Sequence, residues 1–133
     1  MRVVLDTNVL ISGIFWKGAP YSIVAAWAKG RFEVVISKNI LHEYFAVLKR
    51  IDTRGDIAEQ WGMFILENAH VVKASNLVKL SRDNADDKFI NTALIGQADY
   101  IISGDDDLLS LKEKSPVAVI SPRKFLVILD KMS

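Results

Sequence analysis

Acidic side chains follow the ends of predicted strands in this sequence, where they could act together as ligands of a divalent cation. Asp6 directly follows the apolar run 2–5, and Asp105 comes soon after the run 100–103. Glu43 lies in the second turn of a predicted helix that begins just after another strand. Carboxylate oxygens are the ligands that Mg²⁺ and Mn²⁺ prefer. An ion held in this way can activate a water molecule and neutralise charge that develops on a phosphate.

A further acidic segment fits this arrangement less simply. Asp83 and Asp87 are four residues apart, so they share a face if both are helical. They open the helix that precedes the run 100–103. Under simple alternation of strands and helices, we expect this end of the helix at the opposite sheet edge from Asp6, unless a long approach brings it over. Spacing alone leaves the position of these two acids open.

Each acid also has a structural interpretation. Asp6 could cap a turn, and Glu43 could belong to a solvated helix surface, as most glutamates do. Asp83 or Asp86 could cap a helix at its positive end, and Asp105 could cap the short helix that follows it. Taken singly, each acid favours a structural role. Gathered at one edge, however, they would repel one another and raise each other's pKa, a cost that a divalent cation relieves.

Apolar runs alternate with segments of helical periodicity along the chain. The predicted strands are Arg2–Leu5, Phe32–Ile36, Val71–Val72, Tyr100–Ser103 and Val117–Ile120. The predicted helices are Pro20–Lys29, Lys38–Lys49, Asp56–Asn68, Asp86–Gln97, Asp106–Leu111 and Arg123–Asp130. Ser37 offers an N-cap, and Pro122 suits a first helical turn. Strands separated by helices, with short continuous apolar runs, indicate an α/β fold with a parallel sheet covered on both faces.

Composition limits the class of protein. The chain has 133 residues, a length typical of one domain, so we expect residues 1–133 to form a single domain. Half of the residues are hydrophobic, which excludes a disordered chain. No apolar run reaches about 18 residues, so no membrane span is expected, and no signal-peptide pattern opens the sequence. The lack of cysteine excludes disulfides and thiolate zinc sites and fits a cytoplasmic protein.

Charge is distributed unevenly, although the net charge is only +1. Residues 1–55 hold eight Lys or Arg and four Asp or Glu (+4), and residues 56–133 hold nine and twelve (−3). A basic first part and an acidic second part would suit a nuclease, because one could meet phosphates and the other could hold cations. Ordinary surface charge is the alternative interpretation.

The aromatic residues give weaker evidence of function than the acidic residues do. Phe15 and Trp16 lie in a predicted loop after the first strand, and Trp27 and Trp61 lie in helical apolar stripes. Trp16 could stack on a nucleic-acid base. We expect instead that it is buried in the core or in a dimer contact.

Four segments, in order, resemble the motifs of PIN-domain proteins, of the VapC-like kind found as toxins of prokaryotic toxin–antitoxin pairs. The resemblance covers nearly the full length, and the segment Pro122-Arg-Lys-Phe-Leu126 resembles the end of the toxin-like branch. The four segments are Val4-Leu-Asp-Thr-Asn-Val-Leu10, Ser37-x5-Glu43-x6-Arg50, Asp83-x3-Asp87-x2-Ile-x2-Ala93 and Ala98-Asp-Tyr-Ile-Ile-Ser-Gly-Asp105-x-Asp107-Leu-Leu109.

This resemblance implies a Rossmann-like three-layer α/β/α sandwich with a central parallel sheet, and an Mg²⁺- or Mn²⁺-dependent ribonuclease. It also implies that the helix containing Asp87 reaches the acidic pocket. By motif match, the catalytic and metal-binding residues are Asp6, Glu43, Asp87 and Asp105. The weaker metal candidates at the rim are Asp107 and Asp83. The polar residues that orient the pocket or a bound water are Thr7, Asn8 and Ser103. The candidates for contacts with the RNA backbone, each of which could equally be solvated surface, are Lys17, Arg31, Lys38, Lys49 and Arg50.

The resemblance also implies a homodimer that a partner antitoxin neutralises. Two other functions are open. An aspartate-based phosphotransferase could use Asp6 as its nucleophile, but Asn8 stands where such families usually have a second Asp. A phosphoacceptor receiver domain fits worse, because Lys73 follows the third predicted strand where the accepting Asp should stand. The other alternative is a non-catalytic interaction or RNA-binding module with the same fold.

Overall fold

The computed structural model describes residues 1–73, 75, 77–80 and 84–132. Within them, five strands form one parallel sheet, in the order β3-β2-β1-β4-β5. The strands are β1 (Arg2–Leu5), β2 (Glu33–Ser37), β3 (His70–Val72), β4 (Tyr100–Ile102) and β5 (Ala118–Ile120). The helices are α1 (Thr7–Phe15), α2 (Ala19–Ala28), α3 (Lys38–Ile51), α4 (Asp56–Asn68), α5 (Asn84–Ile95), α6 (Asp106–Leu109) and α7 (Pro122–Met132).

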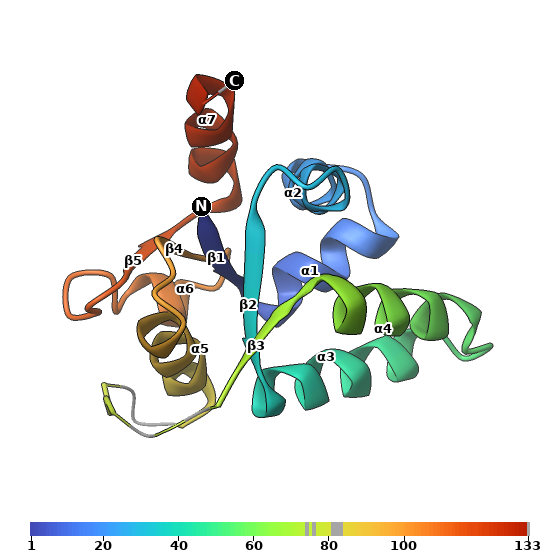
Figure 1. The fold of residues 1–133 in the computed structure, drawn as a ribbon, viewed down its shortest axis with the longest axis horizontal. Coiled ribbons are helices and arrows are strands. Elements are labelled where there is room, and N and C mark those ends of the chain that lie inside the picture. Colours follow the sequence, from blue (N-terminus) through green and yellow to red (C-terminus); the bar gives the residue numbers. More distant parts are fainter. Residues whose placement is uncertain (74, 76, 81–83, 133) are drawn as a thin grey trace.

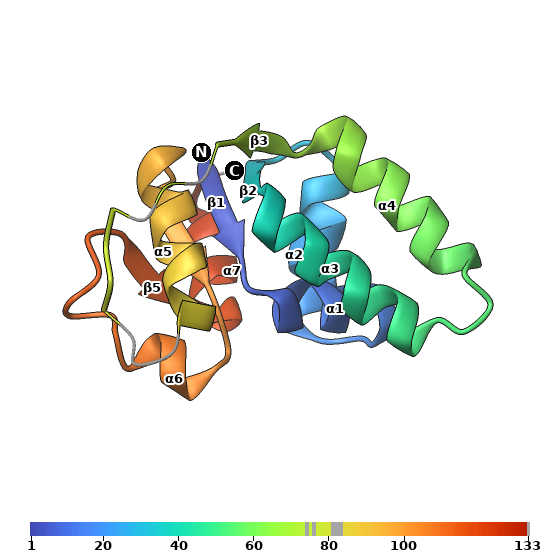
Figure 2. The ribbon, with the colours of Figure 1, turned by 90° about the horizontal axis from the view of Figure 1, so that it is seen from below.

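Helices cover both faces of this sheet, which confirms the predicted three-layer α/β/α sandwich. In Figure 1, α1 to α4 lie to the right of β1 and β2, and α5 lies to their left. Figure 2, seen from below, places α5 and α3 on opposite sides of β1. The buried hydrophobic side chains form one cluster, to which β1, β2 and β4 contribute residues that are almost fully buried. Strands covered on both faces are expected to be continuously apolar, as these are.

The centre of the sheet is the point where the order of the strands reverses. The chain runs outward from β1 through β2 to β3, and then returns to place β4 on the other side of β1. Leu5 lies beside Ile102 in the register, so the residues that follow them, Asp6 and Ser103, leave the sheet side by side. Open α/β sheets bind their ligands at the carboxyl edge of such a switch point.

Helix α5 begins at this same carboxyl edge. Its far end lies at the opposite edge, where the Nη1 atom of Arg2, the first residue of β1, donates a hydrogen bond of 3.1 Å to the backbone oxygen of Gly96. A helix that connects two parallel strands runs antiparallel to them, so its first turn lies where the strands end. The expectation that simple alternation puts this first turn at the opposite edge is therefore wrong, and no unusual approach is needed.

Helix α1 is the one helix of the described residues that the sequence analysis missed. Its sequence is rich in β-branched residues and contains Gly13, which give it low intrinsic helix propensity. Burial compensates, because five of its nine residues are buried. The helix begins directly at the site, since the backbone oxygen of Asp6 accepts hydrogen bonds from the amides of Val9 (3.0 Å) and Leu10 (3.2 Å).

Helices α1 and α2 are both apolar and pack closely together. No single described helix is long and apolar enough to cross a membrane, and α1 with α2 meets that test only as a pair bent by 88°, by length and composition alone.

The close approach of α1 to α2 depends on Gly13. A Cβ atom there would lie 2.4 Å from Cγ2 of Val24 and 2.6 Å from the backbone oxygen of Pro20.

We therefore expect Gly13→Ala to destabilise the protein, although alanine favours a helix more than glycine does. The backbone of α2 must move to admit the methyl group, at a cost of about 1–3 kcal/mol. Chemical denaturation should show a lower midpoint with an unchanged slope. A variant as stable as wild type would mean that α1 and α2 can separate freely.

Candidate active site

Asp6 is held by a short chain of hydrogen bonds between β1 and the end of β4. Its side chain is almost fully buried, and its Oδ2 atom accepts a hydrogen bond of 2.7 Å from the Oγ atom of Ser103. The same Ser103 oxygen accepts a hydrogen bond of 3.0 Å from the backbone amide of Asp105. Ser103 therefore fixes the orientation of the Asp6 carboxylate and ties it to the loop that carries Asp105.

The environment of Asp6 opposes its negative charge. Burial raises the pKa of Asp6 above its ordinary value, and the negative charges of Asp105 and Glu43 raise it further. Hydrogen bonds from Ser103 and from the backbone amide of Asn8 act against this increase. Two acids predicted as site residues, from α3 and from the β4–α6 loop, are thus close enough to Asp6 to affect its charge.

Glu43 joins three helices at this edge. Its Oε2 atom accepts a hydrogen bond from Thr7 Oγ1 at the start of α1, and its Oε1 atom accepts one of 2.6 Å from Lys88 Nζ on α5. The Lys88 side chain is 20% exposed and the Glu43 side chain 34%, so this ion pair is partly shielded from solvent. Lys88 was not predicted as a site residue. Its only sequence signal is its position directly after the acidic pair 86–87.

The two neighbouring acids of α5 have different described interactions. The pKa of Asp86 is raised by burial and by the charges of Asp105, Asp6 and Asp107, while Lys88 opposes the increase. The Oδ1 atom of Asp87 instead accepts a hydrogen bond of 3.1 Å from the backbone amide of Leu80. Asp86, considered above only as a helix cap, therefore interacts electrostatically with Asp6.

Asp87 belongs to an anchor for the segment before α5. One turn further on, the side chain of Asn91 both donates to the backbone oxygen of Val78 (3.0 Å) and accepts from its amide (2.8 Å). Asp87 and Asn91 are both nearly fully buried, so these bonds are protected from water. This pair fixes the chain from Val78 to Leu80 against α5.

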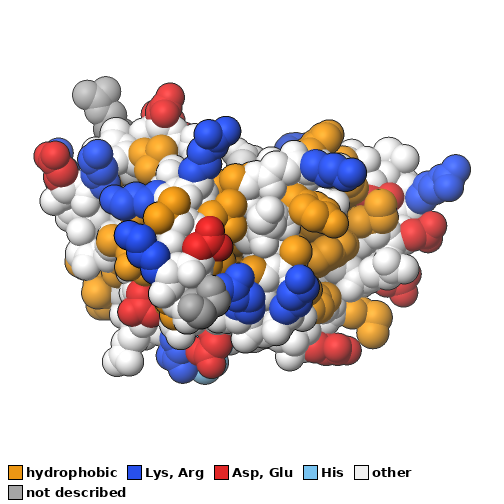
Figure 3. Space-filling view, turned by 90° about the horizontal axis from the view of Figure 1, so that it is seen from above, with side chains coloured by type: hydrophobic (Ala, Val, Ile, Leu, Met, Phe, Trp, Pro, Cys, Tyr) orange, Lys and Arg blue, Asp and Glu red, His pale blue; other side chains and the backbone are white. Residues whose placement is uncertain are grey.

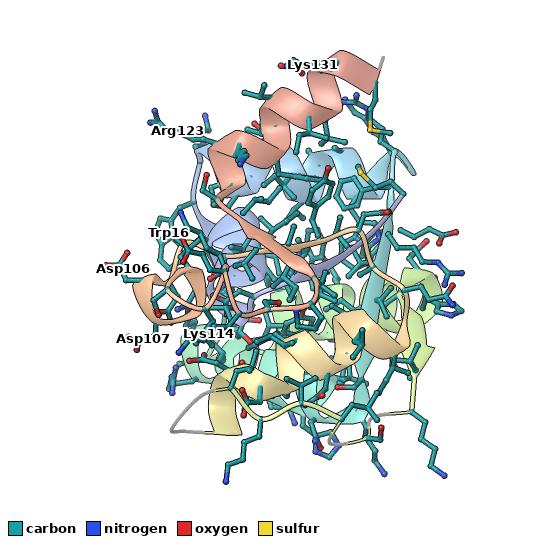
Figure 4. All side chains as sticks on the ribbon, turned by 90° about the vertical axis from the view of Figure 1, so that its left-hand side faces the viewer. Trp16, Asp106, Asp107, Lys114, Arg123 and Lys131 are labelled. Atoms are coloured by element: carbon teal, nitrogen blue, oxygen red, sulfur yellow. The ribbon has the colours of Figure 1, made fainter. Side chains whose placement is uncertain are left out.

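The remaining acids lie at the rim or outside the described residues. The Oδ1 atom of Asp105 accepts a hydrogen bond of 2.8 Å from the amide of Asp107, so Asp105 caps α6, the structural role considered for it above. Figure 4 shows Asp106 and Asp107 pointing outward from α6, and both are exposed. Asp83 lies outside the described residues, and Asn8 is exposed at the start of α1.

The sequence matches the model of the PIN domain over residues 2–107, which is most of the chain. This chain belongs to the PIN-domain family. No curated protein matches it. Solved structures with a similar fold include VapBC2 from Rickettsia felis bound to a fragment of promoter DNA, with 14% identity and a TM-score of 0.64 over 91% of this chain and 98% of that one. PAE2754 from Pyrobaculum aerophilum has 17% identity and a TM-score of 0.64 over 98% of this chain and 90% of that one. At these identities the likeness shows the fold.

Tyr44 of α3 forms a buried hydrogen bond to the strand that precedes Asp6 in this PIN domain. Its side chain is fully buried, and its hydroxyl donates a hydrogen bond to the backbone oxygen of Leu5, the residue before Asp6. Burial and the charges of Asp6 and Glu43 raise the pKa of Tyr44 well above its ordinary value, so the hydroxyl remains a donor. This bond joins α3, which carries Glu43, to the end of β1.

We expect Tyr44→Phe to lower the free energy of unfolding by about 1 kcal/mol, because one buried hydrogen bond is lost while the ring still fills its space. Thermal unfolding should show a decrease of a few degrees. A decrease of more than 10 °C would mean that the ring itself is displaced.

The basic residues predicted to contact RNA lie in different parts of the PIN domain. All five are exposed. Lys38 starts α3 at the carboxyl edge of the sheet, whereas Arg31 precedes β2 at the opposite edge, where its Nη2 atom donates to the backbone oxygen of Leu129 (3.1 Å). Lys49 and Arg50 lie in the last turn of α3, away from the edge where this helix begins.

Trp16 is not buried in the core, contrary to one part of the expectation for it. It is 57% exposed, whereas Trp27 is 4% exposed and packs edge-on against Phe64. The expected loop around Phe15 is also wrong, because Phe15 is the last residue of α1.

Proposed function

We propose that this PIN domain is a metal-dependent ribonuclease. The observation that carries the proposal is the link through Ser103 that holds Asp6 beside Asp105 at the carboxyl edge of the sheet, next to its switch point. The negative charge of Asp105 raises the pKa of both Asp6 and Asp86. PIN domains are generally nucleases, and a site of this kind suits phosphodiester hydrolysis.

The donor chemistry of this edge fits Mg²⁺ or Mn²⁺. The acids are all carboxylates, the preferred ligands of hard divalent cations, and each added negative charge raises the pKa of Asp6 or Asp86. No three acidic or histidine side chains among the described residues are grouped closely enough to hold an ion as they stand. We propose Asp6, Asp86 and Asp105 as the residues that would hold it, with Glu43 beside them. The motif assigns Asp87 to this site as well, and that assignment stays a prediction that Asp87→Ala tests. Bound there, the ion would lower the pKa of a water molecule and offset charge on the phosphate.

Other residues would prepare this edge. Ser103 holds the Asp6 carboxylate in one orientation. Thr7 and Lys88 hold the two oxygens of Glu43. Lys88 also reduces the net negative charge, which would otherwise repel the phosphates of RNA. We propose it as a further positioning residue.

Contacts with the RNA backbone would come from exposed basic residues near this edge. Lys38, beside the carboxyl end of β2, is better placed than Arg31, which lies at the opposite edge. Lys17 follows the end of α1. Figure 3, seen from above the view of Figure 1, shows Lys and Arg side chains spread among acidic and hydrophobic ones on that face. Contacts with the RNA backbone at the acidic edge would position RNA without reading its sequence.

We further propose that the protein is the toxin of a toxin–antitoxin pair, forms a homodimer and acts in the cytoplasm. The support for an antitoxin partner is the similarity in fold to VapBC2. A small open reading frame next to this gene, whose product co-purifies with the PIN domain and inhibits it, would support this role. RNA cleavage at the full rate in the presence of the product of every adjacent gene would contradict it.

The test of the nuclease proposal is cleavage of single-stranded RNA. Wild-type protein should cleave RNA with Mg²⁺ or Mn²⁺ and stop when EDTA is added. Glu113→Gln removes one exposed negative charge outside the site and serves as a matched control that should cleave like wild type. RNA that is bound but left intact under all metal conditions would instead favour the non-catalytic binding module.

A further inference from the structure

A cavity lies directly beside Asp105. It has a volume of about 270 Å³ and is lined by the first half of α1, the start of α2, the β4–α6 loop and the start of α7. Its lining includes Asn8, Ser12, Pro20, Asp105 and Pro122. The cavity therefore shares one wall with the acidic site, and its other walls combine polar and apolar atoms.

One stripe of α1 leads away from the site along this cavity. Asn8 and Ser12 are four residues apart on the helix, so they lie on one side of it. Trp16 is the first residue after α1 and has extended backbone, and its amide donates a hydrogen bond of 3.0 Å to the backbone oxygen of Ser12. Trp16 therefore directly follows this stripe. Two side chains that can form hydrogen bonds are thus followed by a large aromatic ring.

The Trp16 ring is free to receive a flat ligand. It is 57% exposed, and its only described ring contact is with Phe15, at a centroid distance of 5.8 Å and an angle of 55°. That contact restricts the ring without covering it. Figure 4 shows Trp16 on the same side of the molecule as Asp106 and Asp107 of α6, with Arg123 above it.

We propose that this stripe and cavity form a subsite for an unpaired nucleobase of the RNA substrate, which stacks on Trp16 next to the phosphodiester at the acidic site. The proposal rests on the nuclease function proposed above and adds how the substrate is held. Stacking on an exposed aromatic ring suits single-stranded RNA, because every base has a flat face and paired bases cannot reach the ring. The cavity wall shared with Asp105 favours RNA over a protein partner as the occupant.

The test compares two probes that carry the same number of phosphates. One is an unstructured RNA oligonucleotide of ten nucleotides, and the other is the same ribose-phosphate chain without bases. Binding is measured by fluorescence anisotropy in EDTA, so that no cleavage occurs. Wild-type protein should bind the complete RNA about 5- to 150-fold more tightly than the base-free chain, the range expected for one stacked base.

Three variants decide whether Trp16 is the source of this preference. Trp16→Ala should lose most of it, whereas Trp16→Phe should keep a large part because its ring still stacks. Met63→Ala removes another large apolar side chain, 56% exposed on α4, and should leave the preference unchanged. The salt dependence of binding should not differ between wild type and Trp16→Ala, because no phosphate contact is removed.

The outcomes separate this proposal from the one on which it rests. If wild-type protein cleaves RNA but Trp16→Ala keeps the full preference for bases, the subsite proposal is wrong and the nuclease proposal stands. If Trp16→Ala changes only the oligomeric state, measured by light scattering, Trp16 belongs to a protein interface and the subsite is again wrong. If wild-type protein neither binds nor cleaves the RNA, both proposals fail.

Discussion

Asp6→Asn should reduce RNA cleavage by at least about 10²-fold, the usual loss when one preorganised charged or polar group is removed from an active site. The fold should persist, because an asparagine oxygen can still accept the hydrogen bond from Ser103. Cleavage rates with Mn²⁺ in excess, measured for Asp6→Asn, wild type and the control Glu113→Gln, would test this. Equal rates in all three proteins would place the activity elsewhere or in a contaminant.

The same substitution should raise the metal-free melting temperature at neutral pH or leave it unchanged. The pKa of Asp6 is raised in the folded protein, so the folded state binds this proton more tightly than the unfolded chain. Its contribution to stability is therefore complete below the ordinary pKa of 3.8 and is lost as pH rises through the raised value. Melting curves from acidic to neutral pH should show the advantage of Asp6→Asn growing with pH. A large decrease at neutral pH would instead make Asp6 a structural hydrogen-bond partner.

Asp86→Ala should mainly reduce RNA cleavage, whereas Asp87→Ala should mainly reduce stability, although the two residues are adjacent. Asp86→Ala should reduce the cleavage rate by a similar factor of at least about 10². It should cost little stability, because the charge of Asp86 is repelled by Asp105 and Asp6 in the folded protein. Asp87→Ala should lower the free energy of unfolding by about 1–3 kcal/mol, because the Leu80 amide loses a charged acceptor. Cleavage assays well below both melting temperatures, together with denaturation curves, would separate the two effects.

This pair of variants also tests the assignment made from the family motif. If Asp87→Ala abolishes cleavage without loss of stability while Asp86→Ala remains active, the motif match to Asp87 is right and the assignment to Asp86 is wrong. The two variants carry the same change at neighbouring positions, so each serves as the control for the other.

Residues close to strand ends could be predicted because sheet geometry decides their positions. Asp6 and Ser103 follow paired residues of neighbouring parallel strands, and a buried apolar run marks each strand in the sequence. Glu43 follows from the same logic, since α3 begins where β2 ends. Alternation of strands and helices was therefore enough to predict the layers and to bring these residues to one edge.

Other features could not be predicted from the sequence. They depend on how a helix is rotated about its axis and on which residues tertiary packing buries. Adjacent residues on a helix differ by about 100° in direction, so only packing decides whether Asp86 or Asp87 faces the other acids. The Lys88–Glu43 pair joins residues 45 positions apart and has no local signal. Helix α1 was missed because burial, rather than helix propensity, stabilises it.

The most direct test of the metal-dependent nuclease is a crystal of the protein soaked in Mn²⁺, with anomalous diffraction recorded to locate the ion. The account predicts an anomalous peak at the carboxyl edge of the sheet, with oxygens of Asp6, Asp86 and Asp105 as its protein ligands. A crystal at millimolar Mn²⁺ with no peak there, or with those carboxylates turned away from one another, would contradict it.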